Sequence, residues 1–234
     1  MSVSKNKFST TLEKTLEGKI SPEWVVILKN FATKMKFKKD EKIIVEGDKV
    51  KGFYFINSGK VKVISLIDDD HERILRLSHS GHFLGHRAIN VTNYPISAVA
   101  LSDVEVTFIP SDVFQKMIRN NPEFALFLIE FIAGDLRETE ERMKSMIHND
   151  VIIRIANILC MLIDSYGYDD DIKNQLHFPL PRTEMANMAG TSYESVIRTL
   201  SKLEDLKLIR LDRKNIIILK EVALRKLSKE KSRL

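Results

Sequence analysis

Residues 181–203 read PRTEMANMAGTSYESVIRTLSKL, and this stretch predicts two short helices joined by a tight turn. Ala186 stands four residues before Gly190, and Val196 stands six residues after it. A small residue lets two helices approach, a glycine makes the turn, and an apolar residue anchors the second helix. Ser192 suits the N-cap of that second helix, because its hydroxyl can accept an otherwise unpaired backbone N–H. The spacing therefore predicts a helix-turn-helix.

The outward face of the second predicted helix is mainly polar. At helical spacing Val196, Leu200 and Leu203 point inward. The side chains left outside are Tyr193, Glu194, Ile197, Arg198, Ser201 and Lys202. Such a mixture is typical of a helix that reads bases in the major groove of DNA.

Two short strands are predicted directly after this helix, at residues 207–211 and 215–220. A hairpin in this position makes the motif a winged helix-turn-helix, with Arg210, Arg213 and Lys214 near flanking phosphates. The residues that we expect to contact DNA are Arg182, Thr183, Ser192, Tyr193, Glu194, Ser195, Arg198, Lys202, Arg213 and Lys214.

The charge distribution points to the same region. The net charge is +5, and residues 182–234 alone contain 13 Lys and Arg against 7 Asp and Glu. The other 181 residues contain 24 basic and 25 acidic side chains, so the positive excess lies in the C-terminal quarter, where a polyanion would bind. The alternative is a solvated basic tail at Arg225, Lys226, Lys229, Lys231 and Arg233.

The composition limits the class of protein. A chain of 234 residues can form one or two domains with a proper core. It contains no uninterrupted apolar run of about 18 residues and no apolar core of a secretory signal near its start. We therefore expect a cytoplasmic protein without a membrane span. The single cysteine, Cys160, excludes an intrachain disulfide and lies in an apolar helical pattern typical of a buried thiol.

Between residues 35 and 110 the apolar pattern has a period of two. Candidate strands are residues 35–38, 42–45, 52–57, 60–67, 73–77, 96–100 and 104–109, separated by turn-forming residues. Many short strands favour an antiparallel barrel or sandwich. A helical pattern over residues 11–34 precedes them, with Ser21-Pro22-Glu23 as a helix start. Asp68-Asp69-Asp70 predicts an acidic hairpin tip rather than a metal site, because no further ligand pattern follows.

A long helical stretch covers residues 111–148, with a break at Asn121-Pro122, and a second helix covers residues 151–166. Phe124, Phe127 and Phe131 form one stripe, suited to packing against the β-domain. A second stripe, spaced 4-3-4-3, consists of Ile132, Leu136, Thr139, Met143 and Met146. Charged neighbours such as Asp135 keep this heptad seam narrow, which favours a dimer contact. Burial against the same chain is the alternative.

The predicted fold is α+β: an N-terminal antiparallel β-roll, a long dimerisation helix, and a C-terminal winged helix-turn-helix. This order and its motifs resemble the Crp/Fnr family of regulators over roughly residues 20–220. The resemblance rests on the motifs IVEGD at 44–48, GFYFI at 52–56, SGKV at 58–61, GHFLGH at 81–86, and residues 182–203. The resemblance implies an effector-sensing domain at residues 1–117, a dimerisation helix at 118–148 and a DNA-binding domain at 149–234. It also implies double-stranded DNA, RNA polymerase, a second copy of the chain and a small-molecule effector as partners.

In that family, a glutamate and an arginine four residues apart read a GA step, and Glu194 and Arg198 match them. A carboxylate accepts from cytosine N4, and a guanidinium binds guanine O6 and N7 together. The alternative is a surface ion pair worth only ~0.3–0.5 kcal/mol. Tyr193 and Ile197 depart from the residues familiar in the family, which leaves the outer bases of the half-site open.

The effector half departs further from the family pattern. Gly85 is followed by His86 and Arg87 where cyclic-nucleotide-binding members have a glutamate, and Ile96 stands before Ser97 where they have an arginine. A phosphate would lack its bidentate partner, so we predict that cyclic AMP is not the ligand, although Arg87 could bind a phosphate in another geometry. The candidate effector residues are Gly85, His86, Arg87 and Ser97. One cysteine cannot ligate an iron–sulfur cluster.

A second hypothesis is a haem- or small-molecule-binding redox or gas sensor of the same architecture. Candidate axial ligands are His71, His79, His82, His86 and His148, with Met143 and Met146 near the pocket. The spacing of His79, His82 and His86 would also suit zinc. An enzyme is not expected, because the sequence shows no phosphate-binding glycine loop, nucleophile elbow or spaced carboxylate pair with a base.

Overall fold

The structure is a computed structural model that describes residues 9–66 and 72–230, except for the side chains of Arg142, Met146, Ile147 and His148. It divides into two compact units, which we call the barrel unit, ending at Arg137, and the winged-helix unit, beginning at Glu138. Helix α4 (Pro122–His148) contains the boundary. This partition differs from the predicted limits at residues 117 and 148. The predicted hairpin tip Asp68–Asp70 and His71 lie outside the described residues.

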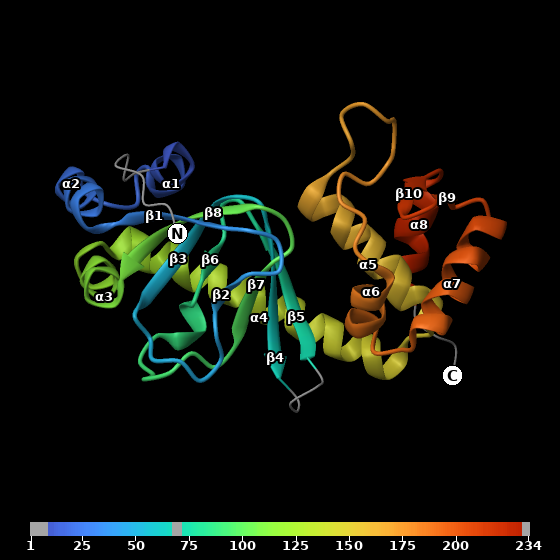
Figure 1. Cartoon of the computed structure of the whole chain (residues 1–234), viewed down its shortest axis with the longest axis horizontal. Coiled ribbons are helices and arrows are strands. Elements are labelled where there is room, and N and C mark those ends of the chain that lie inside the picture. The colour runs from blue at the N-terminus through green and yellow to red at the C-terminus, as the bar shows by residue number, and fades with distance from the viewer. Residues whose placement is uncertain (1–8, 67–71, 231–234) are drawn as a thin grey trace. The chain divides into compact units, whose positions relative to one another are not determined.

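The barrel unit is a β-roll of two four-stranded antiparallel sheets (Figure 1). One sheet has the order β1-β8-β3-β6 and the other β2-β7-β4-β5. The strands are β1 (Thr33–Phe37), β2 (Lys42–Ile44), β3 (Gly52–Ser58), β4 (Lys60–Leu66), β5 (Glu72–His79), β6 (Phe83–Leu84), β7 (Ser97–Ala100) and β8 (Val104–Pro110). All the predicted strands are present. The two-residue strand β6 was not predicted, because it is too short to show a period.

Three helices gather at one end of the β-roll: α1 (Thr10–Leu16), α2 (Pro22–Phe31) and α3 (Ser111–Asn120) (Figure 1). The prediction of helix up to residue 34 was wrong, because Lys34 belongs to strand β1, where it pairs with Thr107 of β8. Pro22 begins α2 as expected. The backbone N–H of Ser21 donates to Asn121 Oδ1 at 2.9 Å, which ties the start of α2 to the end of α3.

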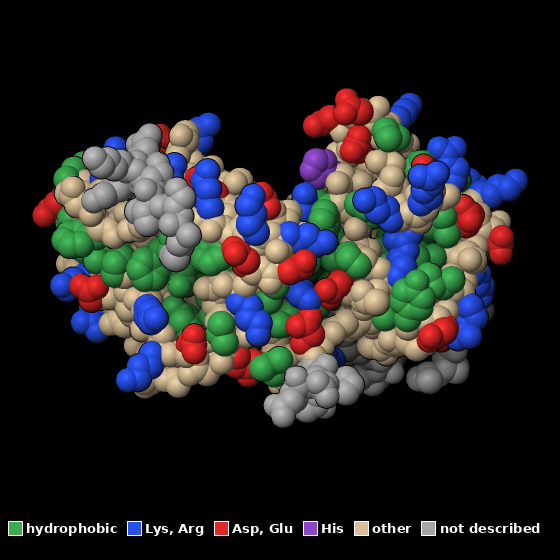
Figure 2. Space-filling view, in the orientation of Figure 1, with side chains coloured by type: hydrophobic (Ala, Val, Ile, Leu, Met, Phe, Trp, Pro, Cys, Tyr) green, Lys and Arg blue, Asp and Glu red, His purple; other side chains and the backbone are tan. Residues whose placement is uncertain are grey.

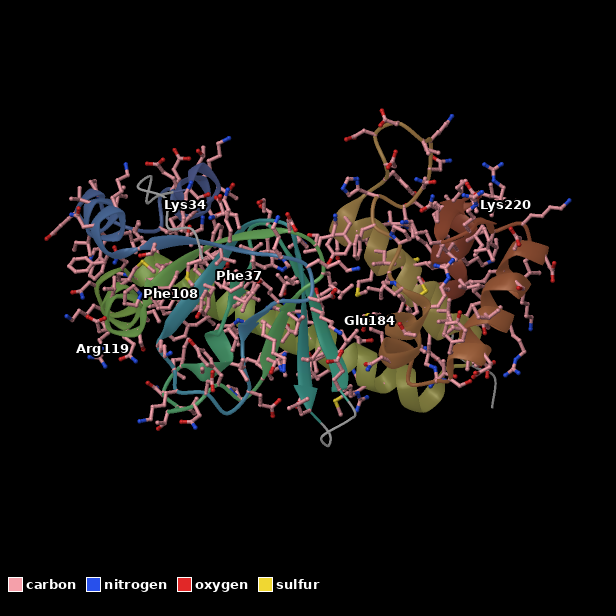
Figure 3. All side chains as sticks on the ribbon, in the orientation of Figure 1. Lys34, Phe37, Phe108, Arg119, Glu184 and Lys220 are labelled. Atoms are coloured by element: carbon pink, nitrogen blue, oxygen red, sulfur yellow. The ribbon has the colours of Figure 1, made fainter. Side chains whose placement is uncertain are left out.

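Two apolar clusters form the core of the barrel unit. One packs the helical end against the sheets and includes Phe53, Phe83, Phe114 and Phe124, which are all at most 1% exposed. Phe127 and Phe131 of α4 pack against it. The second cluster lies between the sheets, and Phe37 and Phe108, labelled in Figure 3, are partly buried at its edge. The predicted phenylalanine stripe of α4 therefore does pack against the β-domain.

Up to residue 230, where the described part of the winged-helix unit ends, it contains four helices and a two-stranded wing besides the end of α4. They are α5 (Val151–Tyr166), α6 (Arg182–Ala189), α7 (Tyr193–Asp205), β9 (Ile209–Asp212), β10 (Asn215–Ile218) and α8 (Glu221–Ser228). Helix α5 has its predicted bounds and buries most of its apolar side chains, including Cys160. Burial raises the pKa of the Cys160 thiol, which makes it a poor nucleophile.

Helix α8 corrects the interpretation of the C-terminal residues as a solvated tail. Arg225 of α8 binds Asp164 of α5 at 2.7 Å and Glu221 at 2.7 Å, and the Tyr168 hydroxyl donates to Glu221 at 2.5 Å. Leu224 is fully buried between these polar contacts. Arg225 is therefore a structural residue, whereas Lys231 and Arg233 lie outside the described residues. Among the described helices, none combines the length and apolar character that crossing a bilayer requires.

Candidate nucleic-acid interface

The turn between α6 and α7 has the geometry that its sequence predicts. Gly190 adopts a left-handed conformation with φ 59°, and the backbone N–H of Thr191 donates to Ala186 O at 3.0 Å to close α6. Ser192 is extended, and its hydroxyl accepts the backbone N–H of Ser195 at 3.2 Å. The predicted N-cap is thus confirmed. The glycine and the cap together determine the residue at which α7 begins.

Helix α7 has a sharp division between its faces. Val196, Leu200 and Leu203 are at most 1% exposed, as predicted. The opposite face is exposed and carries Ser192, Tyr193, Glu194, Ile197, Arg198, Ser201 and Lys202. Ser195 is half-buried at the edge. A helix held by one apolar stripe presents the remaining side chains as a rigid surface.

Glu194 and Arg198 lie one turn apart on this exposed face. Hydrogen bonds from its own backbone N–H and from the Ser192 side chain lower the pKa of Glu194, so the carboxylate is ionised at neutral pH. The Arg198 charge lowers that pKa further, as the smallest of the contributions. Among the described contacts, no ion pair within 4.0 Å joins the two side chains. The Glu194 carboxylate is thus held by its own backbone N–H and by Ser192 rather than by a close ion pair with Arg198.

The wing presents two basic residues at its tip. Strands β9 and β10 pair antiparallel with Asp212 opposite Asn215, which leaves Arg213 and Lys214 in the turn. Arg213 has φ 52°, a left-handed conformation that costs a non-glycine residue about 1 kcal/mol or more. Both side chains are exposed.

Arg182 connects the wing to the helix-turn-helix. Its guanidinium Nη1 donates to Lys214 O at 3.1 Å, so this half-buried side chain at the start of α6 positions the tip of the wing. Thr183 is exposed in the same first turn of α6. The predicted DNA-contacting residues thus gather on α6, α7 and the wing of one unit. Lys and Arg side chains border this part of the winged-helix unit in Figure 2.

The candidate effector residues have a different setting, within the barrel unit. Gly85 has φ 87° and precedes a short 3-10 helix, His86–Ala88. Ser97 is 2% exposed, and its hydroxyl accepts the backbone N–H of Glu46 at 2.9 Å. The Ser97 hydroxyl therefore holds the loop after β2, and a Cβ at position 85 would come within 3.5 Å of Phe53 and Tyr94.

His86 and Arg87 both bind Asp135 of helix α4. Arg87 Nη2 lies 2.8 Å and His86 Nε2 lies 3.3 Å from Asp135 Oδ2. Arg76 of β5 approaches the other oxygen, Oδ1, at 3.3 Å. Asp135 and Arg76 are 8% and 5% exposed. Asp135, expected as one of the charged residues that flank the seam, is the centre of a buried charge cluster, the Asp135 cluster (Asp135, Arg76, His86 and Arg87).

The electrostatics of the Asp135 cluster follow from burial. Burial by itself raises the pKa of Asp135, but the hydrogen bond from His86 and the charges of Arg76 and Arg87 outweigh it, and the pKa lies well below its usual range. Burial also lowers the pKa of His86, and the bond to Asp135 offsets this in part. The carboxylate is ionised and the imidazole neutral at pH 7.

Sequence reasoning missed Arg76. The available signal was its position two residues after Ile74, on the same face of the strand, where a buried arginine needs a carboxylate partner. Its partner lies on a distant helix, so the sequence does not identify it.

The candidate metal-binding histidines do not converge. The rings of His79 and His82 lie 4.0 Å apart, while His86 faces Asp135 and Phe83 O. Among the described residues, no group of three or more His, Cys, Asp or Glu side chains is arranged to hold a metal ion. His71 lies outside the described residues, as do the side chains of His148 and Met146.

The fold and the interface define a class of protein: a winged helix-turn-helix DNA-binding unit joined through a long helix to a β-roll. Comparisons with known proteins agree with both halves. Residues 34–121 match the cyclic nucleotide-binding domain family, and residues 153–227 match the Crp-like helix-turn-helix domain family.

Individual proteins are similar to this chain in sequence or in fold. The transcriptional activator protein Anr of Pseudomonas protegens is 25% identical over 187 residues, covering 80% of this chain and 77% of its own. The CRP-like cAMP-activated global transcriptional regulator of Mycobacterium tuberculosis is 25% identical over 200 residues, covering 85% and 89%. The structure of FixK2 from Bradyrhizobium japonicum has a TM-score of 0.75 at 22% identity, covering 85% and 98%. The chain belongs to the Crp/Fnr family and is a DNA-binding transcription regulator.

Replacing Asp135 by Asn should destabilise the barrel unit. The variant keeps the shape of the side chain but leaves two guanidinium groups without their carboxylate, which costs about 3 kcal/mol at a buried site. Trp24, the single tryptophan, is buried in the barrel unit, so its fluorescence during urea unfolding measures the change. Asp112→Asn is the control, because its pair with Lys116 is exposed and should contribute less than about 1 kcal/mol. Equal stability of the two variants would contradict the buried cluster.

The stability of the barrel unit should fall in mild acid because of His82. Burial, helped by the charges of His79 and Arg76, lowers the pKa of His82 to about 3. In the unfolded chain the His82 imidazole takes up a proton near pH 6.5, whereas in the folded chain it stays neutral until about pH 3. The free energy of unfolding is therefore highest above pH 6.5 and decreases as the pH falls toward 3. Between pH 7 and 5 we expect a loss of about 1–2 kcal/mol by Trp24 fluorescence. His82→Gln should remove the loss of stability that His82 causes between pH 7 and 5. If the variant has the same pH profile as the parent, His82 is not the cause.

Proposed function

We propose that the chain is a homodimer that binds an inverted repeat in double-stranded DNA and responds to an effector other than cyclic AMP. The observation that carries the proposal is the exposed pair Glu194 and Arg198 on a helix whose inner face is fully buried. Side chains held rigidly on one helix face can match a fixed series of base edges.

The chemistry of the pair supports reading of a GA step. Ionised Glu194 can accept a hydrogen bond from cytosine N4, and Arg198 can bind guanine O6 and N7 with two donors. Arg213 and Lys214 at the tip of the wing suit phosphate contacts, which add affinity without sequence preference. Lys202, exposed at the end of the same face, can add another phosphate contact.

An exposed apolar seam on α4 supports the homodimer. Leu136 and Met143 are each 57% exposed and Ile132 is 37% exposed, although all three are large apolar side chains. Ile129, 62% exposed, extends the same heptad pattern one step toward the start of the helix, and Thr139 lies half-buried within it. These exposures favour a partner helix over burial against the same chain. Met146 continues the spacing, but its side chain lies outside the described residues.

A symmetric dimer would carry two recognition helices related by a two-fold axis. Such an arrangement requires two inverted half-sites about one helical turn apart. The seam lies on α4 and crosses the boundary between the two units, whereas the reading helix α7 lies within the winged-helix unit, so each is tested by its own variant below.

The internal contacts of the barrel unit argue against cyclic AMP. A cyclic phosphate needs a charged donor that is free to bind it, whereas the Arg87 guanidinium donates to Asp135. Ile96, where the family pattern has an arginine, supplies no donor from its side chain. An effector of this chain must therefore be recognised by other contacts, or must first displace Asp135.

Replacing Leu136 by Glu should convert the dimer to a monomer. The change puts two like charges at the centre of an apolar seam, and light scattering after size exclusion measures the mass. Val26→Glu is a matched control, because Val26 is 58% exposed on α2, away from the seam, and its variant should stay dimeric. If the Leu136→Glu protein has the mass of the parent dimer, the seam on α4 is not the dimer contact.

Replacing Glu194 by Ala should relax base preference more than it weakens DNA binding. Selection from random duplexes should enrich an inverted repeat with the full chain, and the variant should lose preference at one base pair per half-site, by about tenfold. Lys214→Ala is the contrasting variant: it should weaken binding to all sequences alike and lower the salt dependence. Failure to enrich an inverted repeat, or uniform loss of affinity in Glu194→Ala, would contradict base reading.

A further inference from the structure

The exposed face of α7 contains one feature that the polar pair does not explain. Ile197 is 39% exposed there, and Tyr193, one turn earlier, is 48% exposed. Ile197 is not one of the buried residues of α7: it lies about 60° around the axis from Leu200, at the edge of the buried stripe, and its side chain remains exposed.

Helical geometry puts Ile197 within the face that carries the reading pair. Successive residues rotate by about 100° around the axis, so Ile197 lies about 60° from Glu194 and about 100° from Arg198. Ser201, on the next turn, lies between the directions of Ile197 and Arg198. A surface that brings Glu194 and Arg198 to base edges therefore brings Ile197 toward a neighbouring base pair.

The chemistry of isoleucine limits what it can recognise. Its side chain has neither donor nor acceptor, so it cannot bind the polar edges of guanine, cytosine or adenine. Against those edges it would displace water without replacing the lost hydrogen bonds, which is unfavourable. The apolar group that the major groove offers is the C5 methyl of thymine. Tyr193 differs, because its hydroxyl can satisfy a polar base edge or a phosphate.

We propose that Ile197 is a specificity-determining residue that contacts the C5 methyl group of a thymine adjoining the base step read by Glu194 and Arg198. The inference rests on the proposed function and identifies a base outside the GA step. It requires a thymine at one symmetric position of each half-site, on the strand whose methyl faces α7.

The test uses the full chain and the inverted repeat that it selects from random duplexes. Each thymine of the repeat is replaced in turn by deoxyuridine, which removes one methyl group and leaves all base-pair hydrogen bonds unchanged. Binding is measured by fluorescence anisotropy at one salt concentration. At one thymine per half-site we expect a loss of about fourfold, and about tenfold or more when both half-sites are changed.

Two variants attribute the loss to Ile197. Ile197→Ala should bind the thymine and the deoxyuridine duplexes within about twofold of each other, because the partner of the methyl group is gone. Ile172→Ala is the matched control: Ile172 is 47% exposed in the same unit but outside α7, and its variant should retain the full methyl dependence. Equal binding of all three proteins to an unrelated duplex at low salt verifies that each is folded.

The possible results separate this inference from the proposed function. A selected inverted repeat that tolerates deoxyuridine at every position overturns the role of Ile197 and leaves reading by Glu194 and Arg198 intact. A methyl dependence that persists in Ile197→Ala also overturns it. If no inverted repeat is selected, the proposed function fails and this inference fails with it.

Discussion

The burial of Val196, Leu200 and Leu203 is the constraint on which the DNA-binding surface depends. Each side chain is at most 1% exposed, so α7 cannot rotate about its axis without exposing its core stripe. A shift of one residue would turn the helix by about 100° and carry Glu194 away from the outer face. Gly190 and the Ser192 cap determine the first residue of α7 and hence the phase of the whole face. Rigid apolar packing thereby converts a few polar side chains into an ordered series of groups that can read bases.

In the barrel unit, the polar groups near the candidate effector residues bind one another, whereas those on α7 are exposed. Asp135 is buried and bound by Arg76, Arg87 and His86, so the charged groups nearest to Gly85 are engaged within the chain. A buried charge cluster gives up hydration and contributes little net stability. This one joins α4 to strand β5 and to the 3-10 helix His86–Ala88, and so fixes the position of α4 on the β-roll. The cluster holds α4 against the β-roll immediately beside Leu136 of the seam. Any ligand that competes for Arg87 therefore acts on the helix that carries the proposed dimer contact.

The helix-turn-helix and most strands could be predicted from the sequence because they depend on local patterns. Gly190, Ser192 and the spacing of apolar residues specify α6 and α7 without reference to the rest of the chain, and period-two runs specify the strands. Strand β6 and helix α8 were missed, since two residues show no period and the Arg225 contacts to Asp164 are tertiary. The same reason explains Asp135: a charged residue beside a heptad seam is normally solvated, and its burial depends on Arg76, His86 and Arg87, which are far away in the sequence. For the candidate effector residues, the sequence did not show their internal partners, because Asp135 and Glu46 lie far from Arg87 and Ser97 in the chain.

Methylation interference on a selected duplex tests most directly whether this chain reads DNA bases as a symmetric dimer. Dimethyl sulfate methylates guanine N7, one of the two atoms assigned to Arg198, and duplexes that still bind the full chain are separated and sequenced. We expect interference at one guanine in each half-site, the two related by a two-fold axis and separated by about one helical turn. Binding that tolerates methylation at every guanine would contradict base reading by Arg198. Interference at one guanine without a symmetry-related second guanine would contradict the symmetric dimer.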